Sequence, residues 1–383
     1  MKIVYIVESL VLRGGIERIL SEKANYLAEK CGYDVHIVVC SQHPDQPNAF
    51  DLSAAIHQTY LGIPLYLQYR YKYPKRIWIK RQTSNTLRQT LTTCLQSLNP
   101  DIIVGMGHFK ANMICSIDCR AKKVIECHEA RYFTQSGMAN HQNLVAKLFT
   151  KFYRTLYFRT IEKKADAVVT LTEGDKLLWH KAKRIEVIPN FSNMQVSRTS
   201  SCHSKRIIAV GRLSWEKGYN RLIDIWELVS RNNPDWQLDI FGDGELAKDL
   251  NDTIAKKHLN HITIHPATNH ISEEFANSSI CVMTSYYEGF ALVLLEALKH
   301  GVPCVAYDCP FGPASIIENN RCGYLIGNGN IQQFALKLHA LMNDEHTRQE
   351  FSKAAITRTE DFAPDAIMEK WIHLFESLMN LKY

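Results

Sequence analysis

The chain has 383 residues, of which 46% are hydrophobic and 22% charged, and its formal net charge at pH 7 is +6. This length exceeds what one hydrophobic core usually serves, and it predicts two domains of ordinary size in a soluble globular protein. The modest charge does not indicate a nucleic-acid-binding protein, and no apolar run approaches the roughly 20 residues that cross a bilayer.

Two further features of the composition narrow the class of protein. Glu8 interrupts the apolar opening of the chain, so we expect no secretion signal there. The 11 cysteines are scattered without the spacing of zinc sites. We therefore expect reduced thiols, with neither a metal site nor a disulfide framework.

The first half of the chain alternates short apolar strands with helical segments. A strand at 2–7 leads through a glycine-containing loop into a helix predicted for 16–30, and a second strand follows at 35–40. Further strands are predicted at 102–104, 124–126, 167–171 and 184–188. This alternation indicates a doubly wound α/β domain with a parallel sheet.

The second half repeats the alternation after a break. The segment 192–205 is polar, rich in serine and without periodicity, which predicts a linker. Strands are then predicted at 207–210, 238–241, 262–264, 281–283 and 304–306, and the closing segment 364–381 has a helical pattern. Because right-handed crossovers place loops at the carboxyl ends of parallel strands, we expect a ligand in the cleft between the two sets of loops.

The most informative stretch runs from 287 to 298 and carries two glutamates eight positions apart, Glu288 and Glu296. A helix that began near Phe290 would separate the two carboxylates by roughly 12 Å along its axis. That distance is about the reach of a nucleotide diphosphate, from its ribose to the group beyond its second phosphate. An ordinary amphipathic core helix is the alternative interpretation.

The residues between the two glutamates suit a binding site for a nucleotide diphosphate. Gly289 has no side chain where a ligand must approach the backbone. Free N–H groups at the helix start would face the phosphates, helped by the helix dipole. These groups belong to Phe290, Ala291 and Leu292.

Two cations and a glycine pair are further candidates for the same chemistry. Arg212 and Lys217 lie five positions apart around a loop that follows a predicted strand. Cations there can neutralise a pyrophosphate and stabilise it as a leaving group, although a solvated surface pair is the alternative. Gly14 and Gly15 could let the first loop approach the donor phosphates or the acceptor, or could form a plain strand-to-helix turn.

Taken in order, these segments resemble the retaining glycosyltransferases of family 4, which have the GT-B fold of two Rossmann-like doubly wound domains facing a cleft. The resemblance rests on the segments 14–18, 187–190, 210–218, 239–244, 287–298, 301–313, 316–318 and 322–326. It implies an acceptor-side domain at 1–191, a linker at 192–205, a nucleotide-sugar-binding domain at 206–363, and a helix at 364–383 that returns to the first domain. Phe191 and Ala291 stand where family members often carry glycine, which leaves the linker path and the sugar pocket open.

The resemblance also implies roles for particular residues. Arg212 and Lys217 would replace a divalent metal, Glu288 would contact the transferred sugar, and Glu296 the ribose. His128 follows the strand predicted at 124–126 and would contact the donor sugar near its reacting carbon. Its neighbour Glu129 is a weaker candidate. The protein would need neither metal nor cofactor. Attack from the face of the departing phosphate is favoured, while double displacement through a carboxylate stays open.

Two stretches of the first half, 69–81 and 147–164, mix basic and aromatic residues. Such a mixture suits an anionic membrane surface or a lipid diphosphate head group, and a solvated helix face is the alternative. We therefore expect a cytoplasmic protein at the inner face of the cell membrane that does not bind nucleic acid.

The resulting prediction is a retaining, metal-independent glycosyltransferase. It would move a hexose or N-acetylhexosamine from a nucleotide diphosphate sugar, preferably UDP-linked, to a glycan or lipid-linked glycan in surface-polysaccharide synthesis. Two alternatives stay open: a catalytically weak partner subunit with the GT-B fold, and a UDP-sugar epimerase of the same fold.

Overall fold

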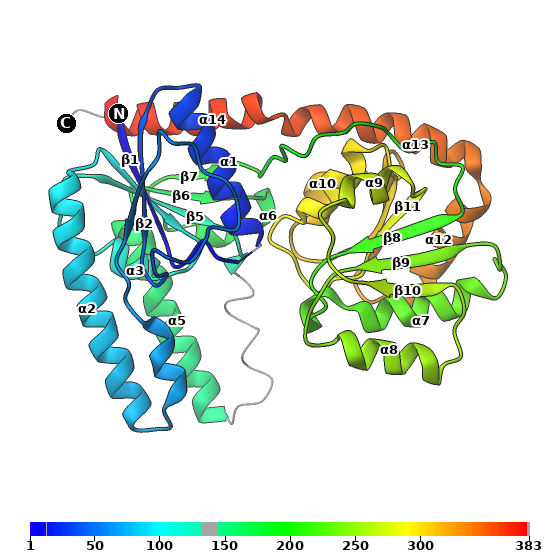
Figure 1. The fold of residues 1–383 in the computed structure, drawn as a ribbon, viewed down its shortest axis with the longest axis horizontal. Coiled ribbons are helices and arrows are strands. Elements are labelled where there is room, and N and C mark those ends of the chain that lie inside the picture. Colours follow the sequence, from blue (N-terminus) through cyan, green and yellow to red (C-terminus); the bar gives the residue numbers. More distant parts are fainter. Residues whose placement is uncertain (13, 132–143, 381–383) are drawn as a thin grey trace. The chain divides into compact units, whose positions relative to one another are not determined.

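The computed structural model of the protein describes residues 1–12, 14–131 and 144–380 (Figure 1). Side chains at 147–151, in the second basic and aromatic stretch, lie outside that description. The chain forms two compact units. The first comprises Met1–Ile188 and Ile367–Tyr383, and the second Pro189–Ala366. The sequence analysis had placed the end of the first domain at 191 and the start of the returning helix at 364, each within three residues of these divisions.

The first unit is built on a seven-stranded parallel sheet in the order β3-β2-β1-β4-β5-β6-β7. The strands are β1 Lys2–Val7, β2 Asp34–Val39, β3 His57–Tyr60, β4 Ile102–Met106, β5 Lys122–Cys127, β6 Ala167–Thr170 and β7 Ile185–Val187. Six of them confirm the predicted strands to within two residues. The edge strand β3 was missed because its sequence, His-Gln-Thr-Tyr, is polar and only partly buried.

Helices cover this sheet. They are α1 Gly15–Glu29, α2 Lys75–Leu98, α3 Ala111–Ile114, α5 Leu144–Lys164 and α6 Glu173–Lys176, with the 3₁₀ turns η1 Leu65–Arg70 and η3 Leu177–Trp179. The closing helix, α14 Pro364–Asn380, belongs to this unit from Ile367 onward. In α2, Leu87, Leu91 and Leu95 recur every four residues and share a core cluster with Val4 and Ile103 of the sheet.

The second unit has a six-stranded parallel sheet in the order β10-β9-β8-β11-β12-β13. Its strands are β8 Arg206–Val210, β9 Gln237–Phe241, β10 Ile262–His265, β11 Ile280–Met283, β12 Cys304–Asp308 and β13 Gly323–Gly327. Five confirm the predicted strands to within two residues. β13 was not predicted as a strand because a glycine at each end shortens its apolar run.

The helices of the second unit follow its strands in turn. They are α7 Tyr219–Ser230, α8 Ala247–Lys256, α9 Ile271–Ala276, α10 Leu292–Lys299, α11 Pro313–Ile316, α12 Ile331–Asn343 and α13 Glu345–Arg358, with the 3₁₀ turns η4 Trp215–Lys217 and η5 Thr359–Phe362. Within the described ranges, none of the helices combines the length and the hydropathy that a membrane span requires. All eleven cysteines are free thiols.

The segment predicted as a linker, 192–205, is tied to the second unit along its length. Lys299 Nζ donates hydrogen bonds to the carbonyls of Ser192 (2.7 Å) and Met194 (2.9 Å). Further along, Arg348 Nε donates to the carbonyl of Cys202 (3.0 Å). The segment has no helix or strand, in agreement with its lack of periodicity. Side chains from distant parts of the chain instead supply the hydrogen bonds that order its backbone.

Candidate active site

The loop that carries Arg212 is fixed by the turn that follows β9. The N–H of Leu213 donates to the carbonyl of Asp243 at 2.8 Å. A side chain at Gly244 would collide with the carbonyl of Leu213, so this close approach requires glycine. Arg212 is exposed, and within the described part of the chain its guanidinium has no hydrogen-bonded or ionic partner. The loop therefore presents an available cation at the carboxyl end of β8.

Gly218 brings Lys217 against the neighbouring strand. It has φ +65°, and a Cβ there would collide with the carbonyl oxygen of Thr284, just beyond β11. The Thr284 hydroxyl donates to the carbonyl of Gly218 at 3.0 Å. The side chain of Lys217 runs beside Gly211, the residue before Arg212. Both cations of the sequence analysis thus belong to one fixed loop.

Lys217 meets the first of the two predicted glutamates. Its Nζ lies 2.8 Å from Oε1 of Glu288, and Ser285 Oγ donates to the same oxygen at 2.7 Å. The side chain of Glu288 is 9% exposed and that of Lys217 is 26% exposed. The Glu288 N–H donates to the carbonyl of Pro310 at 3.1 Å, which fastens this carboxylate to the loop after β12. Ser285 and Pro310 were not predicted as parts of the site.

The helix after Glu288 begins at Leu292, two residues later than predicted. Ala291 precedes it at φ +64° and ψ +57°, in the left-handed region, so Phe290 and Ala291 lie outside the helix. A Cβ at Gly312 would collide with the backbone of Phe290, which shows how closely the loop after β12 packs there. The 12 Å estimate along one helix axis is therefore wrong. Among the predicted donors, only Leu292 has its N–H in the helix.

Two other residues of that prediction lie within and before α10. Glu296 lies within α10 and is buried. Gly289 is half-buried between Glu288 and Phe290. Glu288 and Glu296 therefore do not share a helix.

An aromatic stack beside Lys217 was missed. The rings of Trp215 and Tyr286 are parallel, with centroids 4.5 Å apart and planes at 5°. The guanidinium of Arg221 lies 3.5 Å from the centroid of the Tyr286 ring. The stack links the turn that holds Lys217 to the segment that leads to Glu288. The sequence signal for this stack was an aromatic residue two positions before Lys217 and another two positions before Glu288.

In the first unit, Gly14 and Gly15 start α1 beside a cavity of about 650 Å³. The backbone of Gly14 is extended, so a left-handed conformation is not the reason for a glycine at this position. Polar side chains line the cavity together with Leu12 and Ile16: Glu8, Gln42, Gln46, His108 and Glu129. Only Glu129 had been predicted. Glu8 follows β1 and is the kind of strand-end residue that sequence could have indicated.

His128 lies largely inside the first unit. Its side chain is 4% exposed, and its Nε2 is 3.2 Å from Oε1 of Glu126, at the end of β5. The other oxygen of Glu126 is paired with Lys23 of α1, and both of these side chains are 1% exposed. Trp371 of α14 covers the ammonium of Lys23, 4.2 Å from its ring centroid. Nε2 of His128 therefore faces a buried carboxylate.

The buried carboxyl group of Glu126 is ionised. Burial by itself raises the pKa of Glu126, but the charge of Lys23 and then the interaction with His128 hold that pKa at about 2. Sequence analysis missed both Lys23 and Glu126. The available signals were two charged residues in apolar surroundings: Lys23 on the apolar face of a helix, and Glu126 in an apolar strand.

Two doubly wound units with side chains gathered at strand ends are the architecture of the GT-B glycosyltransferases. A family model described as "Glycosyltransferase Family 4" matches residues 13–195, and one described as "Glycosyl transferases group 1" matches 195–358. Together they cover most of the chain. The protein belongs to glycosyltransferase family 4.

Similar proteins agree with this assignment. The amylovoran biosynthesis glycosyltransferase AmsD of Erwinia amylovora is 35% identical over 218 residues, which are 54% of this chain and 61% of that protein. The match therefore spans about three fifths of that relative's length. An uncharacterized glycosyltransferase of Haemophilus influenzae is 25% identical over 377 residues, which are 97% and 98% of the two chains.

A solved structure shares the fold throughout. The TarM protein of S. aureus, crystallised with fondaparinux, alpha-GlcNAc-glycerol and UDP, has a TM-score of 0.78 at 17% identity. The comparison covers 98% of this chain and 99% of TarM. At this identity the likeness shows the fold alone, and it confirms the predicted GT-B architecture.

Proposed function

We propose that the protein is a retaining, metal-independent glycosyltransferase of surface-polysaccharide synthesis. It moves a hexose or N-acetylhexosamine from a UDP-linked sugar to a glycan or lipid-linked glycan. The main support is one loop of the second unit, which carries both the available cation Arg212 and Lys217, whose Nζ lies 2.8 Å from Oε1 of Glu288. Amylovoran synthesis by one relative and UDP in the TarM crystal support the pathway class and the donor nucleotide.

Binding of the donor would change the ionic partner of Lys217 from Glu288 to the pyrophosphate. Without a ligand, the ammonium is neutralised by Glu288. A bound pyrophosphate would draw Lys217 toward itself and Arg212, since two cations stabilise the charge that develops on the departing phosphate. Glu288 would then accept hydrogen bonds from sugar hydroxyls, and Ser285 keeps its carboxylate in place.

In this proposal the acceptor attacks from the face that the phosphate leaves, so that configuration is retained without a covalent intermediate. The departing phosphate oxygen takes the proton of the acceptor hydroxyl. His128 would position the sugar, with its ring oriented by Glu126. Double displacement through Glu288 is the competing mechanism.

The cavity of the first unit suits a hydroxyl-rich acceptor. Glu8, Gln42 and Glu129 line it and offer carboxylate or amide groups to hydroxyls. Its carboxylates would repel a phosphate placed inside the cavity, so we propose a neutral sugar as the group that enters. A lipid diphosphate, if present, would lie outside the cavity, against the basic stretches.

We also propose that the protein contacts the inner face of the cell membrane through η1 and the first turns of α2. Tyr69 and Tyr73 are each 70% exposed there, and Trp78 is 61% exposed. Lysines and arginines alternate with them, including Arg76, which lies over the rings of Tyr69 and Tyr73. Exposed aromatic groups with cations suit the interface of an anionic bilayer. Figure 1 shows the starts of α2 and α5 extending below the sheet of the first unit.

The direct test is calorimetric titration of the full chain with UDP, GDP and ADP in EDTA. UDP is expected to bind without metal and to bind the Lys217→Ala variant more weakly. Binding that appears only after Mg²⁺ is added would overturn metal independence. Transfer from UDP-sugars to a soluble acceptor, followed by NMR of the new linkage, tests retention. An inverted anomeric centre would refute that part.

A further inference from the structure

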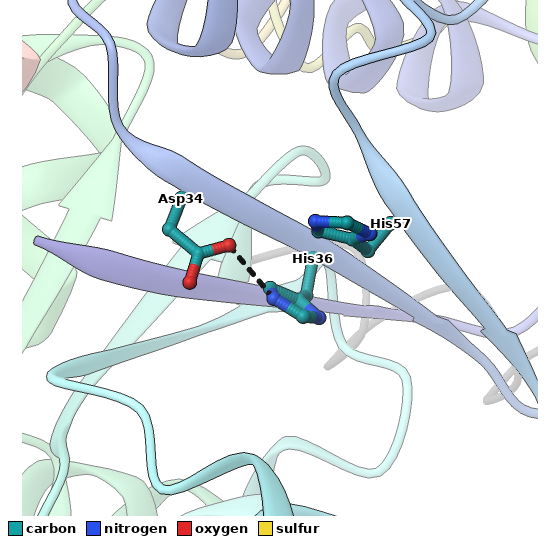
Figure 2. A group of neighbouring side chains, drawn as sticks. All are labelled: Asp34, His36 and His57. Atoms are coloured by element: carbon teal, nitrogen blue, oxygen red, sulfur yellow. Dashed lines mark hydrogen bonds and ion pairs between the residues drawn. The ribbon is translucent and has the colours of Figure 1, made fainter.

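Three metal-ligating side chains meet on the outer strand pair of the first sheet. Asp34 and His36 are two positions apart in β2, so they point to the same face. His36 is the register partner of His57 in the edge strand β3. Because neighbouring strands lie about 4.8 Å apart, this register places the two imidazoles side by side. Figure 2 shows the two rings one above the other, with Asp34 directed toward His36.

The distances suit a small ion. Nε2 of His36 is 2.8 Å from Oδ1 of Asp34, and the rings of His36 and His57 have centroids 4.7 Å apart. One ligand atom from each residue lies within 4.8 Å of the other two. Among the described residues, no other group of three histidine, cysteine or carboxylate side chains is so close. Asp34 and His57 are exposed, so an ion can enter from solvent.

Asp34 also has a cationic neighbour. Nζ of Lys2 in β1 lies 3.3 Å from Oδ2 of Asp34, whereas Nε2 of His36 is close to Oδ1. Oδ1 faces the imidazoles.

We propose that Asp34, His36 and His57 bind one divalent first-row transition ion, for which Zn²⁺ is the probe. Two imidazole nitrogens and one carboxylate oxygen form a donor set that such ions prefer, and water would complete the coordination. The three residues lie near the amino ends of β2 and β3, whereas Gly14 follows the carboxyl end of β1. The site is separate from the proposed transfer chemistry, and its ion would tie the edge strand to the sheet.

The test uses the full chain, stripped of metal with EDTA and dialysed. Calorimetry with Zn²⁺ is expected to give one ion per chain. Removing a residue that only hydrogen-bonds to a metal ligand weakens metal binding about 10–100-fold. His57→Ala removes a ligand itself, so it is expected to weaken binding at least about tenfold. The control is His43→Ala, which removes another exposed histidine beside a carboxylate, Asp45, and should leave the affinity unchanged.

Cobalt distinguishes this site from the free cysteines. Co²⁺ bound by imidazole and carboxylate shows only weak visible bands, whereas thiolate ligands add intense near-ultraviolet bands. Weak visible bands that disappear in His57→Ala support the proposal. Thiolate bands, an unchanged His57→Ala affinity, or no binding at millimolar Zn²⁺ would each overturn it. A melting curve of His57→Ala that matches the metal-free parent shows that the variant is folded.

Discussion

The ammonium of Lys217 and the carboxylate of Glu288 form a 2.8 Å ion pair although 71 positions separate them in the chain. Ser285 donates to the same carboxylate oxygen, so Glu288 keeps a partner when Lys217 turns to another anion. The pair therefore connects donor binding with the orientation of the carboxylate that we assign to the sugar.

Lys217→Ala is expected to weaken the binding of UDP about 10–100-fold, because a hydrogen bond to a charged group contributes about 1.5–3 kcal/mol. Calorimetry in EDTA measures the change. Lys205→Ala is the matched control, since Lys205 forms an exposed ion pair with Asp235 in the same unit. Equal UDP affinities for the two variants would remove Lys217 from the site.

Gly218→Ala is expected to destabilise the second unit by roughly 2 kcal/mol or more and to abolish UDP binding. The added methyl group meets the Thr284 carbonyl, and alanine at positive φ is strained. The control is Gly327→Ala at the end of β13, where a Cβ meets no atom within 4 Å and φ is not positive. Thermal unfolding gives the comparison. If both variants melted alike, the close approach at Gly218 would not be needed.

Lys23→Met is expected to lower the free energy of unfolding of the first unit by about 3–5 kcal/mol, because it leaves the carboxylate of Glu126 buried without its ammonium partner. The double variant with Glu126→Gln is expected to regain part of that loss. Guanidinium unfolding measures both, with Lys205→Met as the exposed control at about 1 kcal/mol or less. A loss no larger than the control's would argue against a charged pair.

Stability is expected to fall as the pH decreases from about 6.5 to about 4. Burial lowers the pKa of His108 from 6.5 to about 4, although a hydrogen bond with the Glu129 carbonyl acts in the opposite direction. The unfolded chain therefore binds a proton in this window that the folded protein does not, and acid favours unfolding. His108→Gln should flatten this limb, whereas the exposed His203→Gln should not. Parallel limbs for His108→Gln and the parent would contradict this assignment.

Replacing Tyr73 and Trp78 by serine is expected to reduce binding to vesicles of anionic lipid several-fold without affecting UDP affinity, because exposed aromatic side chains anchor at the interface. Co-sedimentation at increasing salt measures it. Leu336→Ser removes a side chain of the second unit that is 66% exposed and should leave vesicle binding intact. The membrane proposal fails if the two variants bind vesicles equally.

Local pattern determined most of the fold. Eleven of the thirteen strands follow from short apolar runs, and the alternation of strands with helices was sufficient to predict two parallel doubly wound units. The same reading placed Arg212, Lys217 and Glu288 at the carboxyl ends of strands. Each of these signals lies within a window of about ten residues, which is why sequence contains them.

The remaining features depend on contacts between residues far apart in the chain. Ala291 adopts a left-handed conformation where the loop around Gly312 packs against its neighbour, and this moved the start of α10. Lys23 meets Glu126 across 103 positions. The ion site requires the register of β2 with β3, a strand too polar to be predicted. Side-chain charge and strand pattern are local properties, but pairing energies depend on neighbours that only the tertiary structure brings together.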